Sequence, residues 1–145
     1  MAKEKTSFRI KLQRMVAEEF AMLKEAYDES VKPRFSYHLS FGVDRADQVI
    51  GCFLNLDFTS NDRTFIKLAF ACHYHIHPES WEELSSIPGP MVLQPKMMIL
   101  LGQTTFGAAR GYLQAKTENT PFNSFMIPMV MIEKNITEPL QIEEG

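Results

Sequence analysis

Three stretches in the middle of the chain decide the fold: RFSYHLSFGV at residues 34–43, VIGCFLNLDF at 49–58 and FIKLAFACHYHI at 65–76. In each of them, apolar side chains alternate with polar or small ones. Successive residues of a β-strand point to opposite faces, so this period of two predicts three half-buried antiparallel strands. We expect their sheet, over about residues 34–77, to have one apolar face and one mostly polar face.

The parity of the apolar residues predicts how neighbouring strands pair. They are odd-numbered in the first strand and even-numbered in the second, which places His38 beside Asn55 and leaves a four-residue loop at 45–48. Between the second and third strands, pairing Cys52 with Cys72 leaves Asn61-Asp62-Arg63 as the loop. Both loops have lengths and residues typical of β-hairpins.

Apolar residues at helical spacing predict further elements on both sides of this sheet. A helix is expected over about residues 13–28, after a possible short strand at 7–12, from one stripe of residues: Leu12, Met15, Val16, Phe20, Leu23 and Tyr27. After the sheet, a short helix is expected over residues 78–84 and a long one over about 95–117. Pro95 suits the first turn of a helix.

The C-terminal part is expected to be irregular. Residues 125–132, FMIPMVMI, should be extended, because Pro128 excludes both a regular helix and a central strand. Residues 133–145 are interpreted as a frayed acidic tail. No repeat or linker interrupts the chain, so residues 1–145 are interpreted as a single α+β domain.

Composition disfavours several functions. The 145 residues carry 15 Lys and Arg against 18 Asp and Glu, a net charge of −3, which disfavours nucleic-acid binding. No apolar run is long enough to cross a bilayer, and the start, MAKEKTSFRI, does not resemble a signal peptide. Cys52 and Cys72 are expected to be reduced core residues. We therefore expect a cytoplasmic protein without membrane insertion.

Catalytic motifs are not found, and we expect neither an enzyme nor a cofactor. The paired carboxylates read as solvated surface, and phosphate-binding glycine loops and nucleophile motifs are missing from the sequence. His73, His75 and His77 would line one face of a strand and are candidate metal ligands. A solvated row of histidines is the favoured interpretation, because no carboxylate partner follows from the pairing.

Two patterns in the second half of the chain suggest interaction surfaces. Gly107, Gly111 and Ala115 form a small-residue stripe on the long helix, which favours a close subunit contact over packing on the protein's own sheet. The chain also has nine methionines, six of them from Met91 onward. They are interpreted as core residues, and any exposed ones would form an adaptable apolar groove.

The order of elements resembles the SecB family of protein-export chaperones. The resemblance covers about residues 33–132 and rests on three motifs: Phe106-Gly-Ala-Ala109-Arg110, Thr120-Pro121-Phe122 and Phe125-Met-Ile127-Pro128. It implies an antiparallel four-stranded sheet (a meander) with the long helix on its apolar face. It also implies a homo-oligomer, a dimer or a dimer of dimers, that takes part in protein folding or transport.

The activity implied is ATP-independent binding of unfolded or extended client polypeptides. Six residues are candidates for client contact: Phe106, Tyr112, Phe122, Phe125, Met129 and Met131. Two other functions remain open. One is a metal-binding protein that uses the three histidines, and the other is a structural oligomeric subunit without client binding.

Overall fold

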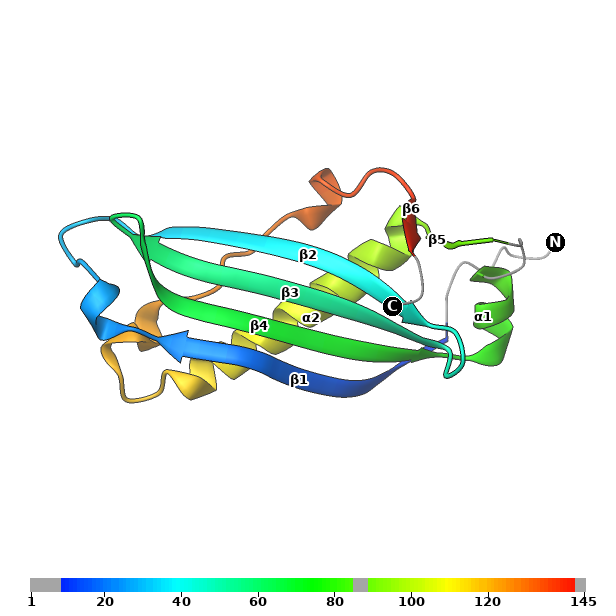
Figure 1. Cartoon of the computed structure of the whole chain (residues 1–145), viewed down its shortest axis with the longest axis horizontal. Helices are drawn as coiled ribbons and strands as arrows, with labels where there is room; N and C mark the ends of the chain where they lie inside the picture. The colour runs from blue at the N-terminus through cyan, green and yellow to red at the C-terminus, as the bar shows by residue number, and fades with distance from the viewer. Residues whose placement is uncertain (1–8, 85–88, 143–145) are drawn as a thin grey trace.

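A computed structural model describes residues 9–84 and 89–142 and contains one large antiparallel sheet crossed by one long helix (Figure 1). The strand order in the sheet is β1-β4-β3-β2. The strands span Ile10–Met22 (β1), Arg34–Asp44 (β2), Val49–Ser60 (β3) and Arg63–Ile76 (β4). Helix α2, Pro95–Lys116, lies diagonally behind the sheet in the figure. The α+β class and the four-stranded sheet with a long helix are as predicted.

The predicted pairing of the three central strands is confirmed. His38 lies opposite Asn55 in β2 and β3, and Cys52 lies opposite Cys72 in β3 and β4. The loop at residues 45–48 separates β2 from β3. Because the side-chain period of a strand is two, this register places the even-numbered apolar residues of β3, from Ile50 to Phe58, on the face toward α2, and Val49 and Phe53 on the other face.

The second hairpin is tighter than predicted. Its loop is Asn61-Asp62, with φ angles of 55° and 64°, and Arg63 already pairs with Ser60. Two positive φ angles are typical of the type I′ turn, whose twist matches that of the flanking strands. The pairing shifts by one residue after Phe58. The shift lets both Phe65 and Ile66 be fully buried.

The predicted helix over residues 13–28 is wrong, because Ile10–Met22 forms edge strand β1. Strand β1 pairs with β4 and carries two register shifts, at Leu12/Arg14 and Ala17/Glu19. Each shift adds a residue, so the side chains toward α2 recur at spacings of two and three: Leu12, Met15, Ala17, Phe20 and Met22. This irregular spacing imitates the stripe of a helix. Of the possible strand at 7–12, residues 7 and 8 lie outside the described residues.

The smaller elements lie around the sheet and the long helix. They are α1 (Pro78–Leu84), β5 (Met91–Leu93), β6 (Leu140–Ile142) and the 3-10 helices Lys24–Ala26, Pro121–Ser124 and Ile132–Lys134. The acidic tail is not frayed over its described part, because β6 pairs with β5 and Ile142 is buried. The apolar side chains at 132, 136 and 142 explain this order, because they bury against the core. Residues 143–145 lie outside the described part.

The core fills the space between the sheet and α2. Tyr74 of β4 is its largest fully buried side chain, and its hydroxyl lies 2.9 Å from Thr105 Oγ1 and donates to the carbonyl of Leu101 at 3.2 Å. The hydroxyl groups of Tyr74 and Thr105 thereby both have hydrogen-bond partners in the interior. The long helix is thus fixed to the centre of the sheet.

Candidate functional site

The two edge strands of the sheet, β1 and β2, differ in how well they are protected against pairing with another strand. Strand β1 has two bulges and is rich in charge, features by which proteins prevent unwanted strand pairing. Strand β2 pairs with β3 without interruption along all of its length. From Phe35 to Val43 it contains no Asp, Glu, Lys or Arg. Within the described chain, no backbone hydrogen bond reaches the outer edge of β2. Strand β2 therefore presents a free edge.

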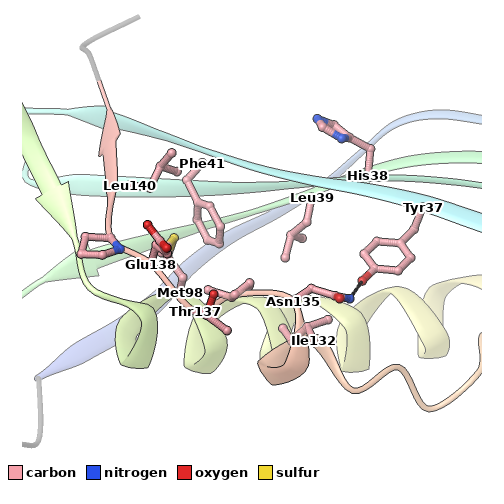
Figure 2. Close-up of a pocket in the computed structure, with 12 residues that line it drawn as sticks. Tyr37, His38, Leu39, Phe41, Met98, Ile132, Asn135, Thr137, Glu138 and Leu140 are labelled. Atoms are coloured by element: carbon pink, nitrogen blue, oxygen red, sulfur yellow. Dashed lines mark hydrogen bonds between the residues drawn. The ribbon is translucent and has the colours of Figure 1, made fainter.

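A groove of about 420 Å³ opens beside this edge. Tyr37, Leu39 and Phe41 point into it from β2, and Met98 of α2 and Ile132 form its inner side (Figure 2). Its opposite wall is the run of chain from 135 to 140. Most of the lining is apolar, and the described lining contains one carboxylate, that of Glu138. Such a groove suits apolar side chains.

Arg110 fixes an extended run of chain, residues 126–131, which we call the methionine segment and which leads to the groove. Arg110 of α2 donates from Nε to the carbonyl of Ile127 at 3.0 Å and from Nη2 to the carbonyl of Pro128 at 2.7 Å. Within this segment, the side chain of Ile127 is buried. Three methionines remain on its outer side, Met126 at 65%, Met129 at 84% and Met131 at 53% exposed. They directly precede Ile132, which is buried and lines the groove.

The six predicted client-contact residues fall into three groups, which are buried, partly buried and exposed. Phe106 and Phe122 are buried, so they support the surface from beneath and are not available for direct contact. Tyr112 is partly buried against Phe20 and Phe70. Phe125 is half-buried in an aromatic cluster with Tyr27, Phe58, Phe65 and Phe122. Met129 and Met131 are exposed.

Sequence reasoning missed most residues of the groove: Tyr37, Leu39, Phe41, Met98, Ile136 and Leu140. The alternation in β2 showed which side chains face the apolar side. It could not show that β2 lies at an edge, because the edge depends on where β1 joins the sheet. The apolar spacing of Ile136, Leu140 and Ile142 was the available signal for the outer wall.

The predicted oligomer stripe lies on the outward face of α2. Gly107, Gly111 and Ala115 are all exposed, and nothing lies within 4 Å of a Cβ placed on either glycine. Leu100, 48% exposed, is on the same face. The stripe therefore does not serve packing of α2 on its own sheet.

The three candidate metal ligands lie at one end of β4. His73 lies opposite Arg14 and Gly51, and His75 lies opposite Lys11 and Val49. The ring of His73 meets that of Phe53 edge to face, at 5.8 Å between centroids. Nδ1 of His77 accepts from the backbone N–H of Glu79 at 3.2 Å. The nearest cross-strand charges are thus cationic, which opposes binding of a metal cation.

The two cysteines are buried in the core beside Thr105. Burial raises the pKa of the Cys52 thiol to about 12 and also raises the pKa of Cys72. A high pKa keeps a thiol protonated and poorly nucleophilic. Both cysteines are free and serve as core side chains.

No helix in the described part of the chain is long and apolar enough to cross a membrane.

Comparison with known proteins gives a likeness in fold. No protein-family model and no curated protein matches the chain. Among solved structures, a SecB-like chaperone of Mycobacterium tuberculosis, in complex with a peptide from the HigA1 antitoxin, matches with a TM-score of 0.51 at 10% identity. The match covers 84% of this chain and 91% of that one. The chain therefore has a SecB-like fold.

A protein of unknown function from Streptococcus agalactiae matches with a TM-score of 0.35 at 13% identity, over 86% of this chain and 100% of that one.

Proposed function

We propose that this chain, which has a SecB-like fold, is a non-enzymatic chaperone that binds extended apolar segments of client polypeptides without ATP. The observation that carries the proposal is the free edge of β2 above an apolar groove. An extended segment could add to this edge through main-chain hydrogen bonds and place alternate side chains in the groove. The solved SecB-like chaperone is in complex with a peptide, which supports peptide binding as a function of this fold.

The exposed methionines extend the proposed surface. Unbranched thioether side chains adapt to differently shaped apolar partners, and they recur at surfaces that accept many clients. Met129 and Met131 therefore remain proposed contact residues. Tyr112 and Phe125 are proposed contacts at their accessible edges.

The proposal is tested by the aggregation of a chemically denatured client protein, diluted into buffer without nucleotide. We expect stoichiometric amounts of this protein to suppress light scattering. Leu39→Lys places a charge in the groove, and Ser40→Lys places the same charge on the other face of β2. Suppression should be lost in the first variant and kept in the second. Equal suppression by both variants would reject β2 as the site.

We further propose that the protein works as a homo-oligomer through the outward face of α2. Support comes from the exposed stripe of Gly107, Gly111 and Ala115, on which a second copy could approach closely. Light scattering should give the mass of a dimer or of a dimer of dimers, and Gly111→Leu should lower it. A wild-type monomer at micromolar concentration would contradict this part.

A further inference from the structure

The outer wall of the groove is one run of chain, residues 135–140, which we call the strap. It is held at both ends by buried side chains, Ile132 before it and Ile142 of β6 after it. Between these ends, Thr137, Glu138 and Pro139 are exposed, and Leu140 is 39% exposed. The strap is thus anchored by Ile132 and Ile142, with Ile136 half-buried against the core at its start and residues 137–140 exposed to solvent.

Few bonds hold the strap to the sheet. Among the described residues, the hydrogen bond that joins it to β2 runs from Asn135 Nδ2 to Tyr37 Oη and is 3.4 Å long. The N–H of Ile136 donates to the carbonyl of Ile132 at 2.9 Å, which fixes the first end. In the same part of the chain, residues 137–139 make no backbone hydrogen bond. Segments with so few buried contacts and hydrogen bonds open at low free-energy cost.

The strap lies where a client strand would continue along β2. After the 3-10 helix Ile132–Lys134, the chain arches past the outer side of β2 and returns as β6 near its C-terminal end (Figure 1). Leu140 and Phe41 line the same end of the groove (Figure 2). Strand β2 has 11 residues, which span about 36 Å, whereas the groove is about 420 Å³. The closed groove therefore takes a few side chains but not a strand that follows all of β2.

We propose that the strap is a displaceable cover that competes with the client for the second half of the β2 edge. In the free protein, Ile136 and Leu140 take the positions of client side chains, and separation of β6 from β5 opens the groove. This inference rests on the proposed function and adds that client binding requires an opening step. Because only the open fraction of the protein is competent to bind, a strap that cannot open weakens client affinity.

A reversible clamp tests the proposal. Val92 and Gln141 lie opposite each other in β5 and β6, and neither is fully buried, so Val92→Cys with Gln141→Cys places two thiols in cross-strand position. The natural cysteines, Cys52 and Cys72, are buried and do not compete. The probe is a fluorescent synthetic peptide in which valine and phenylalanine alternate with serine.

We expect the oxidised double variant to bind this peptide at least about tenfold more weakly than the same protein after reduction, a difference of about 1.4 kcal/mol. The wild type, treated with the same oxidant and reductant, should bind equally in both states. Equal or tighter binding by the oxidised variant would overturn the proposal.

Amide hydrogen exchange separates failure of the strap from failure of the proposed function. If no form of the protein binds peptide, the proposed function fails. Opening of the strap is then still tested by hydrogen exchange in the free protein. Residues 135–142 should then exchange faster than β3 and β4 in the free wild type, and slow down in the oxidised variant. Exchange of this segment as slow as that of β3 would reject a strap that opens.

Discussion

A Cβ placed on Gly102 of α2 would lie 2.6 Å from Cδ1 of Ile132, so the absence of a side chain at 102 lets the base of the groove close on the helix. Leu39 Cδ2 would lie 3.0 Å from the same position. One glycine thus brings together β2, α2 and the anchor of the strap. A buried position that admits no further methyl group is sensitive to overpacking.

Gly102→Ala and Gly107→Ala should therefore differ although both lie inside α2. Alanine stabilises a helix interior by about 1 kcal/mol relative to glycine, and the space around Gly107 is open. At Gly102, overpacking costs about 1–3 kcal/mol and offsets that gain. Urea unfolding should find Gly107→Ala the more stable variant by at least about 1 kcal/mol. Equal free energies of unfolding would show that Ile132 and Leu39 move away freely.

Loss of the Arg110 side chain should loosen the methionine segment. In Arg110→Met the carbonyls of Ile127 and Pro128 lose their charged donor. Because the guanidinium group is partly exposed, we expect a cost of about 1.5 kcal/mol, at the low end for hydrogen bonds to charged groups. Hydrogen exchange should accelerate at residues 126–131. Lys116→Met, which removes a charge from the same helix without touching this segment, is the control.

The Asn61-Asp62 turn should be improved by glycine at its second position. Asp62 has a φ of 64°, a left-handed conformation in which a Cβ is unfavourable. Asp62→Gly gives the Asn-Gly pair preferred in type I′ turns, and we expect it to raise the free energy of unfolding by about 0.5–1 kcal/mol. A decrease in thermal stability would contradict the turn type assigned here.

Alkaline pH should destabilise the protein through its buried thiols. The pKa of Cys52 is about 12 in the folded state and near 9 when the residue is exposed. Between these values the unfolded chain has lost the proton and the folded chain retains it, so stability falls as pH rises above 9. One such thiol lowers the free energy of unfolding by up to about 1.4 kcal/mol per pH unit.

Urea unfolding at pH 8 and pH 10 measures this effect. The difference between the two pH values should shrink in Cys52→Ala relative to the wild type, even though the variant is less stable at both. An unchanged difference would show that Cys52 does not carry the pH dependence. Cys72→Ala should behave similarly, since burial raises the pKa of this thiol too.

The sequence predicted the pairing of the two central hairpins correctly, but it did not predict edge strand β1. Strands β2, β3 and β4 keep a period of two except where β3 and β4 meet their turn, so parity alone predicted the pairing of His38 with Asn55 and of Cys52 with Cys72. Strand β1 was missed because its two bulges break that period. The bulges are visible only once β4 is in place as the partner.

The candidate site was predictable only in part. The outward stripe of α2 follows from local spacing and is exposed. The interpretation of the later methionines as core residues is correct for Met91, Met97 and Met98 but wrong for Met126, Met129 and Met131, which are exposed. The groove depends on long-range facts: that β2 is an edge, and that Ile142 returns to β5. A tail that is polar at most positions gives little local signal that its two isoleucines, Ile136 and Ile142, pack against the core.

The central claim is that clients bind along β2, and hydrogen exchange with and without a bound unfolded client tests it most directly. Backbone amides of Arg34–Asp44 that point away from β3 should become protected when client is added, while the edge of Ile10–Met22 stays unchanged. Protection confined to β1, or none at either edge despite measured client binding, would contradict the account.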